Sequence, residues 1–463
     1  VVAVLSAADI PGVNDCGPIV HDDPILAEGT VNWRGQPMFL VVARTRGEAR
    51  RAAALAAQVA TIEPLPAVLD PLEAHRLQQY VVPPMHLQRG DAAAAIAAAP
   101  HRLEGRFSLG GQEQFYLEGQ IAYALPQEND GLLVHSSTQH PTEMQHVVAH
   151  ALGLAAHQVQ VQCRRMGGGF GGKESQSAVF AAVAAIAAHR LQCPVKLRPD
   201  RDDDFLITGR RHGFEFRYRI GHDDSGRLLG ADVEMVSNAG ASADLSAPVM
   251  TRALCHFDNA YWLPNVDLRG YCARTNTQSN TAFRGFGGPQ GALAVEMVLD
   301  SVARRLGLDP LEVRRANFYG TTERNVTPYG QTVEDNVIAP LVTELADTAH
   351  YRQRRAEIAA QGGAIPFSRF MELCLYAPGL GYYSAGSAKF GGAGDFVTAP
   401  ELGGLFAATV AGVLAGPLRE LGTQARMLEV GGGSGAFAEV ALGRLAQLDA
   451  LPRRYAILEP SAD

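Results

Sequence analysis

A run of glycines between a strand and a helix constrains the fold of this chain more than any other sequence feature. Residues 166–174 read MGGGFGGKE; a short strand is expected before them at 159–164, and an alanine-rich helix after them at 175–191. Glycine lets a backbone approach a ligand with no Cβ in the way. The segment predicts a strand–loop–helix unit in which the loop either contacts a ligand or closes a tight turn.

Three interpretations of this loop stay open from its spacing alone. Gly167, Gly172 and Lys173 have the spacing of a phosphate-binding P-loop, but Glu174 stands where that loop needs a magnesium-binding hydroxyl. The glycines also fit a dinucleotide-binding turn, which needs an acidic residue about 20 positions further on. Only Asp200 is available, 28 residues after Gly172. The third interpretation is a strand-to-helix turn without a ligand.

A second glycine loop at residues 280–291 reads NTAFRGFGGPQG. Arg284 and Phe286 alternate with its glycines, so one loop carries a cation and an aromatic ring. A guanidinium group binds anions through paired hydrogen bonds, and an aromatic ring packs on flat groups. The two loops together predict a site for a polar, heteroaromatic ligand.

The composition excludes several classes of partner. There are 40 Lys and Arg residues against 48 Asp and Glu, a net charge of −8, so no basic excess is available to bind nucleic-acid phosphates. The longest aliphatic run, Ala178–Ala188, has eleven residues, whereas a bilayer helix needs about 20. We therefore expect no nucleic-acid partner and no membrane span. We also expect no signal peptide, because no positively charged segment precedes a short apolar stretch at the start.

The cysteines and the chain start give two further expectations. The six cysteines are at least seventeen residues apart, so no zinc pair or iron–sulfur run can be drawn. They favour small buried thiols in a reducing compartment, the cytoplasm. The chain opens at Val1 inside an apparent strand, and we expect a front segment to be missing.

Two changes of character divide the chain. A proline-punctuated stretch at 63–74 follows an expected helix at 44–60, and near residues 357–364 a charged helix gives way to a proline-, glycine- and tyrosine-rich passage. Between these points we expect strands within 102–125, a helix at 141–152 and a hairpin around 223–226. Both changes predict domain edges.

Long strings in the first part of the chain resemble the molybdopterin-binding subunit of bacterial xanthine dehydrogenase. They occur in the family's order: STQHPTEMQH, RRMGGGFGGKE, DRDDDFLITGRRH, DLSAPVMTRALCHFDNAYWLPN, NTAFRGFGGPQG and DPLEVRRANFYG. The resemblance extends from Val1 to about Ala360. It implies a molybdenum hydroxylase that oxidises hypoxanthine and xanthine to urate with oxygen from water. Its electrons would leave through iron–sulfur clusters and FAD on a partner subunit.

The resemblance also implies roles for particular residues. The environment of the molybdenum–molybdopterin cofactor would consist of Gln139, Phe170, Gly171 and Arg284. The purine would be held by Glu174 and Arg252 at opposite edges and by Phe286 on its ring. Glu174 and Arg252 are also the catalytic candidates, because Arg252 could stabilise charge that develops on the purine. Aldehyde oxidases of this kind generally lack the pair, which favours a purine substrate.

Each purine-binding candidate has a structural alternative. Glu174 also fits a carboxylate at a helix N-terminus, Arg252 a surface salt bridge, and Phe286 simple core packing. The family's second half, with its general base, is absent from this sequence. General-base assistance is worth on the order of 10²–10⁴-fold, so we expect the chain to be truncated at both ends and inactive on xanthine alone.

From about residue 363 the sequence is similar to a different family. IPFSRFMELCLYAPGLGYYSAG, GDFVTAPELGGLF, LEVGGGSGAFAEVAL and YAILEPSAD resemble SAM-dependent methyltransferases whose mitochondrial members modify an arginine of a complex I subunit. A strand, a glycine turn, a helix and a second strand are expected over 427–458. The glycine pattern alone fits NAD or FAD equally. The resemblance implies a SAM site at Gly431, Gly433, Gly435 and Glu459, with Gly394 and Asp395 also lining it.

The whole sequence predicts an α+β chain of three parts. Residues 1–80 would be the end of an α/β hammerhead-like module, 81–360 the first half of a mixed-sheet molybdopterin-binding domain, and 361–463 an incomplete Rossmann-like methyltransferase fragment. Two alternatives stay open. In the first, the chain is a methyltransferase fragment with an unrelated N-terminal extension. In the second, it is a non-catalytic chimeric remnant of two gene pieces.

Overall fold

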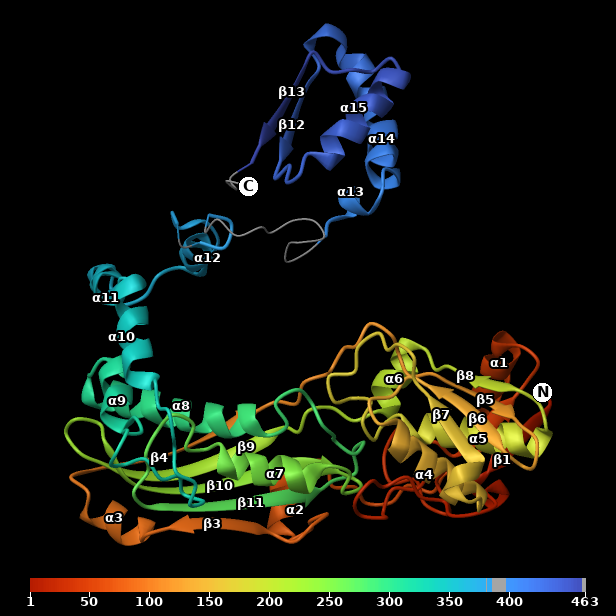
Figure 1. The fold of residues 1–463 in the computed structure, drawn as a ribbon, viewed down its shortest axis with the longest axis horizontal. Helices are drawn as coiled ribbons and strands as arrows, with labels where there is room; N and C mark the ends of the chain where they lie inside the picture. The colour runs from red at the N-terminus through yellow and green to blue at the C-terminus, as the bar shows by residue number, and fades with distance from the viewer. Residues whose placement is uncertain (380, 385–396, 460–463) are drawn as a thin grey trace. The chain divides into compact units, whose positions relative to one another are not determined.

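The computed structural model describes residues 1–379, 381–384 and 397–459. The contacts divide the chain into two compact units, Val1–Val342 (unit 1) and Thr343–Asp463 (unit 2), and each is described by itself. Unit 1 contains a four-stranded and a five-stranded sheet with their helices, and unit 2 contains helices and one pair of strands (Figure 1).

Unit 1 begins with a small two-stranded antiparallel sheet. Its elements are β1 (Ala3–Ser6), η1 (Ala7–Asp9), β2 (Phe39–Val42) and α1 (Arg46–Val59). The helix α1 agrees with the one expected at 44–60. Leu5, Ile25 and Leu26 are buried in the same apolar cluster as the neighbouring four-stranded sheet. This module is therefore anchored by shared core side chains.

The four-stranded sheet has the order β7-β6-β5-β8 and packs against two helices. Its elements are β5 (Ala122–Pro126), β6 (Leu132–Ser136), α4 (Pro141–Leu152), η2 (Ala156–Gln158), β7 (Val159–Gln162), α5 (Ala178–Leu191) and β8 (Val195–Leu197). Strands β6 and β7 are parallel. The aliphatic run 178–188 forms α5, which is buried on nearly all sides because small alanines let neighbouring elements approach closely.

The five-stranded sheet has the order β3-β11-β10-β9-β4 and is mixed, as predicted. Its strands are β3 (Met85–Arg89), β4 (His101–Leu109), β9 (Phe214–His222), β10 (Leu228–Gly240) and β11 (Val266–Arg274). Strands β10 and β11 are parallel, and the other neighbours are antiparallel. The predicted hairpin joins β9 to β10.

Helices pack on or beside this sheet and help to form the main core of unit 1. They are α2 (Pro71–Arg76), α3 (Ala92–Ala98), α7 (Ser246–Cys255), α8 (Gly288–Leu306) and α9 (Pro310–Asn317). The short helix α6 (Arg201–Ile207) lies instead by the four-stranded sheet, where Ile207 packs against its apolar cluster. Side chains of α7 and α8, such as Met250 and Val298, bury strand residues such as Met235 and Leu268 (Figure 1). The sheet and these helices thus share one apolar core, which sets where the connecting loops begin and end.

Unit 2 contains a strand–turn–helix–strand segment, as predicted. Its elements are α10 (Ile338–Thr348, which begins in unit 1), α11 (Tyr351–Ala360), α12 (Phe367–Tyr376), α13 (Ala399–Leu402), α14 (Leu405–Leu421), η3 (Gly422–Gln424), β12 (Arg426–Val430), α15 (Ala436–Gln447) and β13 (Arg454–Leu458). Strands β12 and β13 are parallel, the pairing of a Rossmann-like unit.

The helix α14 bears on the expectation that no segment spans a membrane. By length and composition alone, Leu405–Gln424 is apolar enough to cross one, with a mean hydropathy of 1.2, which the search for aliphatic runs missed. In the structure, Ala411, Ala415 and Leu418 of this helix pack with Ala441 and Leu445 of α15. One face of the helix is therefore packed, but only 22% of the apolar window is buried.

Candidate functional site

The loop between β7 and α5 has a backbone that requires glycine. Gly168 (φ 96°) and Gly171 (φ 99°) are in left-handed conformations, and Phe170 between them has φ 54°. A Cβ on Gly171 would lie 2.7 Å from the carbonyl carbon and oxygen of Ala282, closer than any real Cβ contact. Gly171 is therefore needed for the close approach of the first glycine loop to the second.

Gln139 is fixed against this loop by three hydrogen bonds. It lies between β6 and α4, and its Oε1 accepts from the backbone N–H of Gly171 at 2.8 Å and of Lys173 at 3.3 Å. Its own N–H donates to the carbonyl oxygen of Lys173 at 2.8 Å. A Cβ on Gly169 would overlap the Gln139 amide. The loop therefore fixes the position of Gln139 Oε1.

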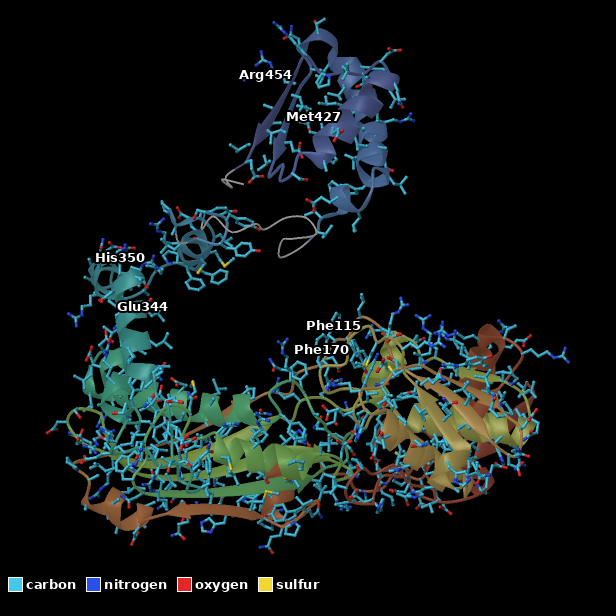
Figure 2. All side chains as sticks on the ribbon, viewed as in Figure 1. Phe115, Phe170, Glu344, His350, Met427 and Arg454 are labelled. Atoms are coloured by element: carbon cyan, nitrogen blue, oxygen red, sulfur yellow. The ribbon has the colours of Figure 1, made fainter. Side chains whose placement is uncertain are left out.

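The second glycine loop closes onto the first. The N–H of Arg284 donates to the carbonyl oxygen of Phe170 at 2.8 Å. The four residues predicted around the molybdenum cofactor thus meet at one place, although they come from segments up to 145 residues apart. The Phe170 side chain is 45% exposed, in the same region of unit 1 as Phe115 (Figure 2). The junction is therefore open to a ligand.

A buried cation lies behind the second loop. Arg211 is 6% exposed, its Nη2 donates to the carbonyl oxygen of Arg284 at 2.8 Å, and its guanidinium lies 4.1 Å from the ring centroid of Phe283. Burial lowers its pKa. Within the described residues, Nε and Nη1 of Arg211 have no hydrogen-bond partner, nor has Oε1 of Gln114, whose Nε2 binds Ala282 of the same loop.

These orphaned atoms test whether the site fits an anionic cofactor. Leaving buried donors and a buried charge unpaired costs several kcal/mol, about 1–3 for each neutral group and more for a charge. A positive group with free donors, next to two loops from which Cβ atoms are excluded, fits a large anionic group that brings its own acceptors. The residues present therefore fit the molybdopterin cofactor, and its phosphate and metal oxygens in particular.

Lys173 corrects one interpretation of the first loop. Its side chain is fully buried, and Nζ donates to the carbonyl oxygen of Glu118 at 2.7 Å and to Ser137 Oγ at 2.8 Å. It also pairs with the Glu118 carboxylate at 3.4 Å and lies 4.7 Å from the Tyr116 ring centroid. Lys173 thus forms a structural ion pair with Glu118 inside the protein, and the P-loop interpretation is wrong.

Asp200 corrects the dinucleotide interpretation. Its carboxylate caps α6 by accepting from the Asp203 N–H at 3.1 Å, and it pairs with Arg50. The acidic residue that a dinucleotide site needs for the ribose is therefore used as a helix cap. A strand-to-helix turn, with or without a ligand of another kind, stays open for this loop.

Glu174 is a half-buried carboxyl group at the end of the first loop. Burial, and then the negative charge of Asp244, raise its pKa against the opposing effect of His140. The fully buried Asp244 accepts from Ser175 Oγ at 2.7 Å and from Thr281 Oγ1 at 2.6 Å, which ties the start of α5 to the second loop. Glu174 therefore keeps its proton to a higher pH than an exposed glutamate does.

Arg252 lies near the end of α7, beside the second loop. Its Nε donates to Nε2 of His256 at 3.1 Å, and a Cβ on Gly288 would lie 3.9 Å from that Nε. Burial and the charge of Arg252 lower the pKa of His256, so its neutral ring can accept this bond. Across the described residues, no ion pair holds Arg252. The surface salt-bridge alternative is thus wrong.

The positions of Phe286, Glu174 and Arg252 do not decide whether these residues bind a purine. Phe286 (φ 52°) is partly buried and packs against the core beneath α7 and α8, as its core-packing alternative expects. No hydrogen bond or ion pair joins Glu174 to Arg252 where the chain is described. The purine-binding roles of these three residues stay predictions.

The predicted SAM residues of unit 2 form a turn at the end of β12. Gly431, Gly433 and Gly435 have φ values of 73°, 52° and 78°, and the N–H of Gly433 donates to Oε2 of Glu459 at 2.7 Å. The strand ends thus bring Glu459 next to the glycine turn. Gly394 and Asp395 lie outside the described residues.

Sequence reasoning missed several residues that build the site. Arg211 lies in the string DRDDDFLITGRRH, where only a charged, exposed segment could be expected, and Gln114 and Asp244 carry no motif of their own. Burial of polar groups depends on the tertiary fold, so spacing gives no signal for it. The one available clue was the short apolar context of Asp244 between two serines.

Comparison with known proteins decides the family. Residues 74–318 match the model of the molybdopterin cofactor-binding domain, which is more than half of the chain. The chain belongs to the molybdopterin cofactor-binding domain family. Residues 1–60 match the a/b hammerhead domain of aldehyde oxidase and xanthine dehydrogenase.

Curated relatives of this molybdopterin-binding domain extend well beyond it. They include the xanthine dehydrogenases of Drosophila subobscura (42% identical over 347 residues) and Dictyostelium discoideum (40% over 352). The nicotinate hydroxylase of Emericella nidulans is 40% identical over 351 residues. These alignments cover 74–76% of this chain and 26% of each relative. The chain thus spans about a quarter of the length of these relatives.

Solved structures confirm the predicted fold class. The aldehyde oxidoreductase of Desulfovibrio gigas has a TM-score of 0.70 at 25% identity over 77% of this chain and 41% of that chain. The quinoline 2-oxidoreductase of Pseudomonas putida 86 has a TM-score of 0.68 at 25% identity over 78% and 48%. A likely methyl transferase of Burkholderia thailandensis is 50% identical over 24% of this chain and 30% of that chain, but its TM-score of 0.22 is too low to bear on unit 2.

Proposed function

We propose that unit 1 is the cofactor-holding part of a xanthine dehydrogenase-like molybdenum hydroxylase that oxidises hypoxanthine and xanthine to urate. The observation that carries the proposal is the junction of the two glycine loops. There the N–H of Arg284 binds the carbonyl oxygen of Phe170, and Gln139 binds the same backbone. Family membership supports the class of cofactor.

The molybdenum cofactor would be held by the residues at this junction. The backbone of Phe170 and Gly171 can approach it because no Cβ intervenes, and the side chains of Gln139 and Arg284 are exposed beside that backbone. Since Oε1 of Gln139 is occupied by the loop, its Nε2–H₂ group is left to donate to an oxygen of the cofactor. When bound, the cofactor supplies the centre that accepts two electrons from the substrate.

We assign purine binding to Glu174, Arg252 and Phe286. The raised pKa of Glu174 favours a carboxyl group that can both donate to and accept from a purine edge. Arg252, which is free of carboxylate partners in the described residues, would stabilise negative charge that develops on the purine, an effect worth roughly 3–4 kcal/mol at comparable sites. Phe286 would present the exposed part of its ring to the purine.

The remaining parts of the reaction belong to other protein segments in this proposal. Electrons would pass to iron–sulfur clusters and FAD on a partner subunit, in the cytoplasm, which the six free cysteines favour. The chain spans about a quarter of the length of its relatives. We therefore propose that the purified chain alone forms no urate.

Cofactor retention tests the proposal. The chain is produced in a host that makes the molybdenum cofactor, and molybdenum and released pterin are measured per chain. We expect both to be retained, and to fall at least tenfold in Gly171→Ala, where the Cβ would meet Ala282. Gly153→Ala is the matched control, because Gly153 is also left-handed (φ 68°) but has open space around it. Equal retention of molybdenum and pterin in both variants would show that the junction of the glycine loops does not hold the cofactor.

For unit 2 we propose SAM binding at the turn of Gly431, Gly433 and Gly435, without methyl transfer. The support is the bond from the Gly433 N–H to Glu459, which places a carboxylate where a ribose hydroxyl can reach it. Equilibrium dialysis with labelled SAM tests this, with Glu459→Gln as the weakened variant. A chain that retains neither molybdenum nor SAM would be the non-catalytic chimeric remnant.

A further inference from the structure

Three arginines from distant parts of the chain converge on one tryptophan ring. The guanidinium carbons of Arg89, Arg227 and Arg324 lie 5.3, 5.8 and 5.2 Å from the ring centroid of Trp262. Arg89 ends β3, Arg227 closes the β9–β10 hairpin, and Arg324 follows α9. Four separate segments of unit 1 thus build one cationic cluster.

The described part of the protein neutralises this cluster only in part. In the part of the chain that the structure describes, none of the three arginines forms an ion pair with a carboxylate, and Nε of Arg227 and of Arg324 has no hydrogen-bond partner. Arg89 and Arg324 donate only to the carbonyl oxygens of Val326 and Ala316, at 2.6 and 2.9 Å. Asp223 is close enough for its charge to attract Arg227, but these two described side chains form no ion pair, and its Oδ1 already accepts from the N–H groups of Ser225 and Arg227.

Repulsion among the three arginines, set against their weak attraction to the tryptophan ring, favours a bound anion over a purely structural cluster. Three like charges around one ring repel each other, whereas the face of the tryptophan attracts each of them only weakly. Burial, and then the like charge of Arg227, lower the pKa of Arg324, and the second of these causes is a sign of this repulsion. All four side chains are partly exposed, so a small ion from solvent can reach them.

The cluster is separate from the glycine-loop junction. Arg89 pairs in register with Val266, and Val266 with Ala231, at one end of the five-stranded sheet. The second glycine loop starts at the other end of β10, where the Asn280 N–H binds the carbonyl oxygen of Ala239. About eight residues of strand, at ~3.3 Å each, separate the two ends by roughly 25 Å.

We propose that Arg89, Arg227, Arg324 and Trp262 form a binding site for a phosphate group. Guanidinium groups from several directions match a tetrahedral oxyanion, since each can donate to a different oxygen. The phosphate is either a free ion or part of a small phosphate ester, and both share this chemistry. The function proposed for the glycine loops does not depend on this site.

Tryptophan fluorescence tests the site directly. The chain has two tryptophans, so Trp33→Phe in the full chain leaves Trp262 as the reporter. Inorganic phosphate is titrated at constant ionic strength, with adenosine monophosphate and acetate as separate arms. We expect a saturable change with phosphate that acetate does not reproduce. Tighter binding of the monophosphate than of phosphate would identify an ester as the ligand, and the reverse would identify the free ion.

Substitutions connect the signal to the cluster. Arg324→Gln and, separately, Arg227→Gln are expected to weaken phosphate binding at least tenfold, and Arg324→Lys less than Arg324→Gln because it keeps the charge. Arg304→Gln is the control, since Arg304 is an exposed arginine that pairs with Asp300 on α8. A change that acetate or chloride reproduces, or unchanged affinity in both glutamine variants, would overturn the proposal.

Discussion

Lys173 shows how a residue within the first glycine loop can serve the fold. Its ammonium group is surrounded by Glu118, Ser137 and Tyr116, and burial lowers its pKa while Glu118 opposes that change. The position of this lysine in the loop could be predicted from the sequence, but the direction of its side chain could not, because Glu118 is 55 residues away. Side-chain direction at such a turn is decided by the tertiary partners.

Replacing Lys173 by methionine tests this structural role. The change leaves the Glu118 carboxylate without its cation, and breaking a buried pair costs about 3–5 kcal/mol. Since Glu118 is partly exposed, we expect the lower end, about 3 kcal/mol, in the free energy of unfolding from urea titration. Lys196→Met on β8 is the exposed control, with a change within about 0.5 kcal/mol. Equal changes in the free energy of unfolding for Lys173→Met and Lys196→Met would show that the Lys173–Glu118 pair does not stabilise the fold.

His212 gives unit 1 a pH dependence of defined sign. Its ring is fully buried beside Ser246, and burial, then the charge of Arg211, lower its pKa from 6.5 to about 3. A base with a lowered folded-state pKa contributes stability above pH 6.5 that is lost as the pH falls toward 3. A shift of this size corresponds to at most about 5 kcal/mol.

We expect His212→Gln to remove this part of the pH dependence. The free energy of unfolding is measured by urea titration at several pH values between 4 and 8, for the native chain and the variant. The native chain should lose stability toward pH 4 more steeply than His212→Gln, with the exposed His157→Gln behaving like the native chain. Parallel curves for all three proteins would contradict the assignment.

At the scale of elements, the close crossing of α7 and α8 fixes the second glycine loop. A Cβ on Gly291 of α8 would overlap the carbonyl oxygen of Ala253, and one on Gly287 that of Val249. The sequence predicted strands and helices such as 141–152 and 214–220 well, because their apolar periodicity and caps are local. It did not predict this crossing, since a glycine inside a helix gives no sign of what lies opposite.

Gly291→Ala tests the importance of the crossing. The added methyl group would force α7 and α8 apart, and overpacking of this kind costs about 1–3 kcal/mol. Gly443→Ala in α15 is the control with free space, because nothing lies within 4 Å of its Cβ position. Since glycine inside a helix is destabilising relative to alanine, this change should stabilise unit 2 by about 0.5–1 kcal/mol. Thermal unfolding followed by circular dichroism distinguishes the two, and stabilisation by Gly291→Ala would contradict the packing.

At the scale of the whole molecule, the two units differ in how much core they contain. Both large apolar clusters lie within residues 1–342, whereas the cluster of unit 2 has only a few buried side chains, mostly alanines. Unit 2 also exposes large apolar side chains, among them Leu402, Leu405, Val413 and Val430. The two family resemblances along the chain could be predicted from sequence motifs. The difference in core size between the units became visible only in the packed structure.

Residues 1–342 are therefore expected to fold without unit 2. We expect the isolated segment to show one cooperative thermal transition at the temperature seen for the main transition of the full chain. Residues 343–463 should show a broad transition and bind a hydrophobic dye, because exposed apolar patches favour association. Calorimetry of both segments checks this. A non-cooperative 1–342 segment would contradict the division into units.

The most direct test of the central claim is the position of molybdenum in crystals of the full chain, produced with the cofactor and measured at the molybdenum absorption edge. The account predicts one anomalous peak at the junction of the glycine loops, next to the backbone of Phe170 and Gly171 and within reach of Gln139. Molybdenum at another place in the chain, or a cofactor-loaded chain with no ordered peak at this junction, would contradict it.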